Sequence, residues 1–278
     1  KESGITNKLS AKQHFMIHGK NENRRTHKIV HSNTIISKLC FYTFLSLAKQ
    51  AYVSDGLSFF RSKFYSHFNL DNYSDPLAPS FFFGIYTDND LNLLKNHKNL
   101  KIVIWGGSDC DPRFKHCEQT IKEVKLINNV IHLSTSECLF NRLKQVSINS
   151  IYVNFNMVDT NIFKKISNTK TQKNIYIYNG KVKGREQLYG NEIYNLITEK
   201  YKDITFIFSN TLNLPCDKMP DVYQTCFLGM RLTKYDGNAN TVQEFEAMGI
   251  PIIHNQSDYG LKWSNIETIV NYIESLRK

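Results

Sequence analysis

The chain has 278 residues, with 35 Lys and Arg against 25 Asp and Glu, 41% apolar residues and 13% aromatic residues. A chain of this length buries roughly 75% of its unfolded surface, so the composition excludes intrinsic disorder. Its 6 cysteines are dispersed without a C-x-x-C pair, which argues against a zinc module or a disulfide-rich secreted scaffold. We therefore expect a folded protein with reduced thiols.

The positive charge is concentrated at the N-terminus. Residues 1–70 carry 11 Lys and Arg against 3 acids, residues 71–155 balance at 9 and 9, and residues 156–278 carry 15 against 13. A protein that binds nucleic acid over its whole surface would be basic throughout the chain, so we expect a local basic patch instead. This patch could contact an anionic membrane, bind nucleic acid or simply be solvated. Because no apolar run approaches about 20 residues and no secretory signal is present, we expect a cytoplasmic, soluble or peripheral protein.

Short apolar runs alternate with helical patterns from residue 81 onward. Before that point, the pattern predicts a strand at 28–31 and a helix over 34–52. Further strands are expected at 81–86, 101–105, 130–133, 151–155, 175–178, 204–209, 227–232 and 251–254. This alternation predicts βα units and parallel sheets.

Two helices can be placed more closely. Ser134 and Glu137 have the spacing of a capping box for a helix that reaches about Lys144. A second helix is expected over 187–200, with an apolar face formed by Ile193, Leu196, Ile197 and Tyr201.

The polar run 154–171 predicts the crossover between two domains. We expect an N-terminal Rossmann-like domain at 1–155, of which 1–70 is basic and matches no motif, and a C-terminal one at 156–278. Ligands of such sheets bind beyond the carboxyl ends of the strands. The loops expected to matter are 106–111, 180–187 and 233–241.

The segment 231–254 combines features of a nucleotide pocket. A strand ends in a polar loop that contains Gly237, and a helix begins near Asn240 and Thr241. The N-terminus of a helix presents free N–H groups and the positive end of the helix dipole, which suits a diphosphate. One turn into the helix, the carboxylate of Glu244 can accept hydrogen bonds from a ribose diol.

Two motifs in this half resemble a known family. Asp236 and Glu244, with seven residues between them, resemble the E-x7-E signature of GT-B glycosyltransferases, and Glu246-Ala-Met-Gly-Ile-Pro resembles the segment that closes it. Upstream, Tyr178-Asn-Gly-Lys-Val-Lys-Gly resembles the diphosphate loop of the glycosyltransferase 4-like group. The resemblance covers 150–278 well and 80–150 loosely. It implies the GT-B architecture, in which two Rossmann-like domains face each other across a cleft.

The resemblance also implies roles for single residues. Asp236 and Glu244 are expected to be catalytic, although the first position is usually Glu. The expected donor-binding residues are Gly180, Lys181, Lys183, Arg185, Arg231, Thr233, Gly237, Asn238, Asn240, Thr241 and Glu246. For the three basic residues of the first loop, the alternative is a solvated loop.

The two motifs disagree on the register of the second acid. Spacing from Asp236 selects Glu244, whereas the Ala-Met-Gly-Ile-Pro context selects Glu246. Residues two apart on a helix point about 200° apart, so only one of them can face the pocket. We favour Glu244 and keep Glu246 as the alternative.

A further candidate lies in the N-terminal half, where the strand at 101–105 leads into Gly106, Gly107 and Asp109. A double glycine lets the backbone approach a ligand closely, and Asp109 could bind sugar hydroxyls or orient the acceptor nucleophile as a catalytic residue. The alternative is a tight turn in which Asp109 or Asp111 caps the next helix.

Together these features predict a glycosyltransferase that moves a sugar from a nucleoside-diphosphate sugar to an acceptor hydroxyl on a glycan, protein or lipid. The resemblance implies retention of anomeric configuration. The nine histidines are dispersed and no H-x-x-H occurs, so we expect no metal and no cofactor beyond the donor, with a basic loop neutralising the leaving diphosphate. The alternatives are a sugar-nucleotide epimerase and a non-catalytic protein that binds nucleotide sugars or nucleic acid.

Overall fold

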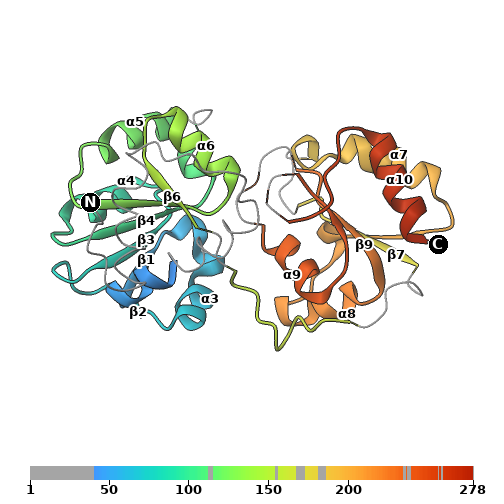
Figure 1. Cartoon of the computed structure of the whole chain (residues 1–278), viewed down its shortest axis with the longest axis horizontal. Helices are drawn as coiled ribbons and strands as arrows, with labels where there is room; N and C mark the ends of the chain where they lie inside the picture. The colour runs from blue at the N-terminus through green and yellow to red at the C-terminus, as the bar shows by residue number, and fades with distance from the viewer. Residues whose placement is uncertain are drawn as a thin grey trace, which may run out of the picture. The chain divides into compact units, whose positions relative to one another are not determined.

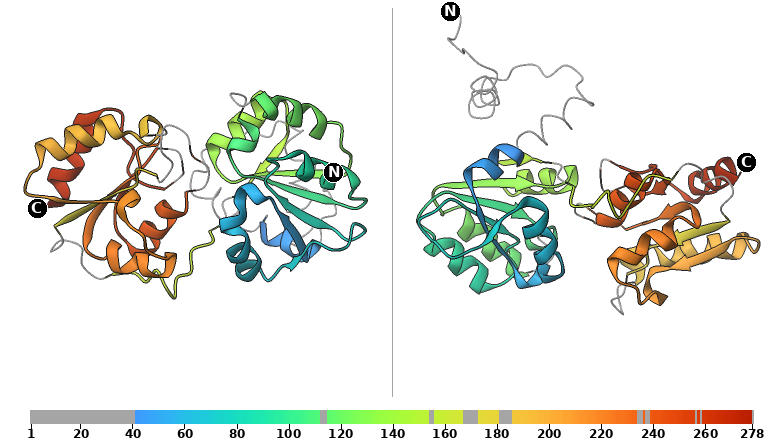
Figure 2. Two further views of the ribbon diagram at one scale, coloured as in Figure 1. Left: turned by 180° about the vertical axis from the view of Figure 1, so that it is seen from behind. Right: turned by 90° about the horizontal axis from the view of Figure 1, so that it is seen from below.

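A computed structural model describes residues 41–111, 115–153, 156–166, 173–180, 186–233, 236, 239–255, 257 and 259–277. These residues form two parallel sheets, each with helices on both faces (Figures 1 and 2). The strand order is β2-β1-β3-β4-β5-β6 in the first sheet and β10-β9-β7-β8 in the second. The predicted α/β class with parallel sheets is confirmed.

The first sheet and its helices follow one another from residue 41. After a helix at 41–47, the elements are β1 (Gln50–Val53), η2 (Asp55–Leu57), α3 (Ser58–Phe68), β2 (Asp71–Asn72), β3 (Ser80–Phe83), α4 (Asp88–Asn96), β4 (Lys101–Trp105), η3 (Ser108–Cys110), α5 (Lys115–Val124), β5 (Val130–Ser134), α6 (Glu137–Gln145) and β6 (Ser150–Tyr152).

The second sheet alternates strands and helices to the end of the described chain. Its elements are β7 (Asn174–Ile177), η4 (Glu186–Tyr189), α7 (Asn191–Lys200), β8 (Thr205–Phe208), η5 (Ser209–Thr211), η6 (Cys216–Lys218), α8 (Met219–Tyr223), β9 (Cys226–Met230), α9 (Asn240–Met248), β10 (Ile252–Ile253) and α10 (Ile266–Arg277). The change of sheet falls between β6 and β7, and the domain boundary at 155/156 stays a prediction.

Each strand predicted from residue 81 onward is present, with the predicted bounds at 101–105 and shifted ends elsewhere. The helix predicted over 34–52 is wrong in its last part. Residues 50–53 form β1, which lies between β2 and β3 and pairs with residues 80–83. The apolar residues of this segment fit a helical period, but hydrogen bonding to β2 on one side and to β3 on the other makes residues 50–53 a strand. The strand predicted at 28–31 and the helix before residue 41 lie outside the described residues.

Two helix starts also differ from prediction. Helix α6 is capped by Ser136, whose Oγ accepts the Leu139 N–H at 3.2 Å, because Ser134 is the last residue of β5. Helix α7 begins only after Gly190, whose φ of 80° breaks the expected helix. The predicted inner face is confirmed for Ile197 and Tyr201, which are buried, and for Ile193, which packs against the core. It is wrong for Leu196, which is 55% exposed, and Tyr194 is buried instead.

The core of the first sheet lies on both of its faces. Phe82, Val103 and Trp105 pack against helices α4, α5 and α6. Since successive strand residues point to opposite faces, Phe81 and Phe83 face the other layer, where their rings meet aromatic side chains of α3 and of the helix at 41–47. Burial on both faces explains the continuous apolar runs of these strands.

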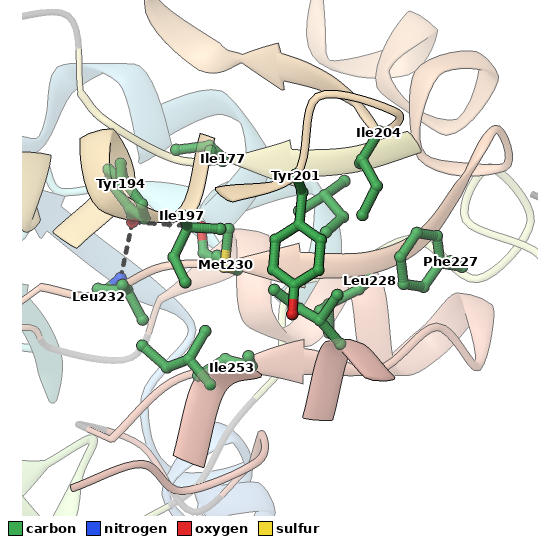
Figure 3. Close-up of a cluster of buried hydrophobic side chains, with 13 residues drawn as sticks. Ile177, Tyr194, Ile197, Tyr201, Ile204, Phe227, Leu228, Met230, Leu232 and Ile253 are labelled. Atoms are coloured by element: carbon green, nitrogen blue, oxygen red, sulfur yellow. Dashed lines mark hydrogen bonds between the residues drawn. The ribbon is translucent and has the colours of Figure 1, made fainter. Parts of the chain in front are cut away.

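The second sheet is covered in the same way. Ile177 packs with α7 and α10 residues in the cluster drawn in Figure 3, while the neighbouring Tyr176 contacts Tyr223 of α8 and Phe245 of α9 on the other face. The buried Tyr194 hydroxyl accepts the Leu232 N–H at 2.9 Å and donates to the Tyr178 carbonyl at 3.1 Å. This hydroxyl therefore joins α7 to the carboxyl ends of β7 and β9.

No helix formed by the described residues combines the length and the apolar character that a membrane crossing requires.

Candidate functional site

Three neighbouring strands of the second sheet end at one edge. Tyr178, Arg231 and His254 follow β7, β9 and β10 directly, and these strands are parallel neighbours. The guanidinium carbon of Arg231 lies 3.7 Å from the centre of the Tyr178 ring, and Nδ1 of His254 lies 2.9 Å from the Arg231 carbonyl oxygen. The sheet order thus places Arg231 between side chains that are distant in sequence.

Arg231 is held by a buried polar network. Its Nε donates to Oδ2 of Asp236 at 2.5 Å, and its Nη1 donates to Oγ1 of Thr241 at 3.4 Å. Thr233 donates to the same Asp236 oxygen at 3.1 Å. Burial by itself lowers the pKa of Arg231, but Asp236 and Tyr178 raise it, and the net pKa lies above its usual value. The structure therefore brings together four predicted site residues around a fixed positive charge.

The two candidate acids on α9 have different surroundings. Glu244 is 5% exposed, whereas Glu246 is an exposed residue. Glu244 accepts hydrogen bonds from the Tyr223 hydroxyl at 3.1 Å and the Cys216 thiol at 3.7 Å. Burial raises the pKa of Glu244, and the bond from Tyr223 works against that rise. This geometry favours the Asp236–Glu244 register over Glu246.

The N-terminus of α9 lies in the same region. Its cap residue, Ala239, provides no side-chain hydrogen bond, and the helix ends at Gly249 with φ 71°. The buried Oδ1 of Asn240 has no hydrogen-bond partner among the described residues. Since the first N–H groups of a helix have no partner inside the helix, this end can donate to an anion beside Arg231.

The loop after β7 shows why glycine is needed at position 180. Gly180 has φ 70°, and a Cβ there would lie 2.2 Å from the Tyr189 ring. Asn179 ties the loop to the end of β8, because its Oδ1 accepts from Ser209 Oγ and the Asn210 N–H, both at 3.1 Å. The predicted donor-binding residues that lie outside the described residues are Lys181, Lys183, Arg185, Gly237 and Asn238.

Asp109 lies in η3, which follows β4 of the first sheet, and is fully buried. Its carboxylate accepts the N–H groups of Ile85 at 3.2 Å and Gly107 at 2.8 Å, and the Gly106 N–H lies 3.0 and 3.1 Å from its two oxygens. Burial raises the pKa of Asp109 to about 6, against the effect of these bonds. Direct contact with an acceptor would have to replace these bonds, so the geometry favours a turn-ordering role, and the catalytic role stays a prediction.

Two tyrosines of the site carry no sequence motif. The hydroxyl of Tyr194 on α7 holds the backbone on either side of Arg231, and Tyr223 of α8 donates to Glu244. No local pattern indicates the second of these contacts. The spacing of Tyr194, Ile197 and Tyr201, all buried, is a helical face that could have signalled the first of them. Among the described residues, no three or more His, Cys, Asp or Glu side chains gather as a metal site, and metal independence stays a prediction.

Comparison with known proteins identifies the fold. No family of proteins matches the chain by sequence, and no curated protein matches it. The structure resembles TarM (TM-score 0.51, 15% identity, 73% of this chain and 49% of TarM). It also resembles sucrose-phosphate synthase from Thermosynechococcus elongatus (TM-score 0.50, 11% identity, 78% of this chain and 66% of the synthase).

A third similar structure is a mutant of S. aureus TarM in complex with fondaparinux, α-GlcNAc-glycerol and UDP (TM-score 0.50, 16% identity, 71% of this chain and 48% of that one). These neighbours are GT-B glycosyltransferases, and the chain has the GT-B fold. The chain spans about half to two thirds of the length of the structures it matches.

Proposed function

We propose that the protein transfers a sugar from a nucleoside-diphosphate sugar to an acceptor hydroxyl. The observation that carries the proposal is the buried network of Arg231, Asp236 and Thr241 beside Glu244, at the edge of a parallel sheet where such folds bind ligands. The GT-B fold and the complex of a TarM mutant with UDP support the same chemistry.

Each part of the donor has a matching group in this proposal. The diphosphate binds at the N-terminus of α9, close to the charge of Arg231, and the loop with Lys181 and Lys183 adds further positive charge. Glu244 accepts the ribose hydroxyls once its bonds to Tyr223 and Cys216 rearrange. Asp236 holds the guanidinium in place, so that little reorganisation is needed when the donor arrives.

The reaction exchanges one bond at the anomeric carbon. The bond from this carbon to the diphosphate oxygen breaks, the acceptor oxygen bonds to the carbon, and the proton of the acceptor hydroxyl passes to the departing diphosphate. Negative charge grows on the leaving diphosphate, where a fixed cation and helix N–H groups stabilise it. Retention of anomeric configuration is proposed from the E-x7-E resemblance alone.

Glu244→Gln is expected to lower sugar transfer at least about tenfold, which corresponds to roughly 1.4 kcal/mol of transition-state stabilisation. The amide cannot accept the two ribose hydroxyls as the carboxylate does. Glu246→Gln is the matched control, because it makes the same change two residues away at an exposed position, and it should keep the wild-type rate. The rates are measured with a radiolabelled donor. If Glu246→Gln loses activity and Glu244→Gln does not, the register is wrong.

Nucleotide sugars are expected to stabilise the folded protein. A ligand present at 100 times its dissociation constant adds about 2.7 kcal/mol, which should raise Tm by roughly 5 °C. A thermal-shift panel of UDP-, GDP- and CMP-sugars measures this and identifies the donor base. If no nucleotide sugar shifts Tm while DNA or RNA binds with steep salt dependence, the protein is a nucleic-acid-binding protein instead.

Product analysis separates transfer from epimerisation. With a bound, radiolabelled donor and no acceptor, an epimerase converts the sugar to its isomer while the nucleotide stays attached. The proposed transferase leaves the donor sugar unchanged under these conditions. Isomerised sugar would overturn the proposal.

A further inference from the structure

A cavity of about 460 Å³ lies at the amino edge of the first sheet, next to the starts of β4 and β5 and the last turns of α4 and α5. It is at the opposite end of β4 from Gly106 and Gly107. Its charged lining residues are Lys95, Lys98, Lys101 and Glu123. The cavity is thus separate from the loops of the proposed transfer reaction, and a ligand could bind there whether or not the protein transfers sugars.

The lysines of this cavity outnumber its acid partners. Lys95 is paired with Glu123. Lys101 is 4% exposed, and its ammonium donates to the carbonyls of Asn99 and Asn128, both at 3.2 Å. Among the described residues, neither Lys98 nor Lys101 forms a salt bridge. Two carbonyl dipoles do not neutralise a buried ammonium, so Lys101 lacks the counter-charge that buried charges require.

The ends of the two helices account for only part of this charge. The carboxyl ends of α4 and α5 carry partial negative charges of about 0.5 each, which attract lysines without any ligand. Together they balance about one lysine, and Glu123 balances another. Lys101 belongs to a strand rather than to a helix end, and one positive charge is left over.

His97 adds an unused polar atom to the cavity wall. It is 2% exposed, and its Nδ1 lies 3.1 Å from the Tyr73 hydroxyl, while its buried Nε2 has no hydrogen-bond partner in the described part of the chain. Burial, followed by the charge of Lys101, lowers the pKa of His97, which favours the neutral ring.

We propose that this cavity binds the phosphate group of a small molecule, with Lys98 and Lys101 as its charge partners and the exposed side chain of Asn128 as a neutral donor. A phosphate offers several acceptor oxygens to ammonium groups, which bind it as point charges. The volume lies within the range of about 300–1,000 Å³ for ligand pockets, so the cavity has room for an organic group attached to the phosphate.

Inorganic phosphate is the probe for this site, with NMR of a ¹³C-histidine-labelled protein as the readout. The His97 resonance, assigned with a His97→Gln variant, reports on the cavity and not on the second sheet. At constant ionic strength, phosphate is expected to shift this resonance saturably. Lys98→Gln changes an exposed residue and should not disturb folding. It is expected to raise the dissociation constant for phosphate at least about fivefold.

Lys125→Gln is the matched control, because it removes the same charge from the chain just after α5 without touching the cavity lining. It should keep the wild-type dissociation constant for phosphate. Equal weakening in both lysine variants, or a His97 resonance that phosphate does not move, would overturn the proposal. An equal affinity for acetate would overturn the assignment to phosphate.

Discussion

Replacing Arg231 by methionine is expected to lower the free energy of unfolding by about 3–5 kcal/mol. Arg231 and Asp236 form an ion pair whose side chains are only 11% and 12% exposed. Removing one partner of a buried pair leaves the other charge uncompensated in a poorly solvated place, and the loss has this size. The same change also removes the guanidinium that packs on the Tyr178 ring.

Urea denaturation of two further variants tests this explanation. Arg277→Met is the matched control, because Arg277 pairs with Asp203 at the surface, where the two side chains are 33% and 63% exposed. Such exposed pairs contribute about 0–1 kcal/mol. Adding Asp236→Leu to Arg231→Met should recover much of the lost stability, since no unpaired carboxylate then remains. An equal loss in Arg231→Met and Arg277→Met would show that burial of the pair has no energetic consequence.

Asp109 is expected to make the stability of the first sheet depend on pH. Its pKa in the folded protein is about 6, raised by burial from an ordinary value of 3.8. Between these values the folded state holds a proton that the unfolded state has released, so Asp109 contributes stability at low pH that is lost as the pH rises through 6. From pH 4 to pH 7 this amounts to about 2 kcal/mol.

The comparison of wild type with Asp109→Asn isolates this effect, because asparagine does not titrate. The variant is destabilised at both pH values, since its amide N–H₂ replaces an oxygen that accepts backbone N–H groups. The difference in unfolding free energy between wild type and variant should be about 2 kcal/mol larger at pH 4 than at pH 7. A constant difference for Asp109→Asn would contradict the raised pKa.

Asp109 and Asp236 show how much of a site can be predicted from the local sequence. The Gly-Gly-Ser-Asp run correctly marks a turn at the end of a strand, but it cannot tell whether Asp109 faces a ligand or its own backbone. The answer depends on Ile85, whose N–H comes from the end of β3. Likewise, the spacing of the motif predicts Asp236 as an acid of the donor site, whereas its pairing with Arg231 is seen only in the folded loop.

By itself, the sequence determined the order of strands and helices from residue 81 onward, because each buried strand leaves a short apolar run and each amphipathic helix leaves a period in its own residues. The end of α9 at Gly249 is likewise a local feature, because the left-handed conformation at this position strongly favours glycine. Only the tertiary structure decided that 50–53 is a strand, that Glu244 is buried while Glu246 is exposed, and that Tyr178 packs on Arg231. These outcomes depend on contacts between residues far apart in the chain, which the strand orders of the two sheets bring together and no local period encodes.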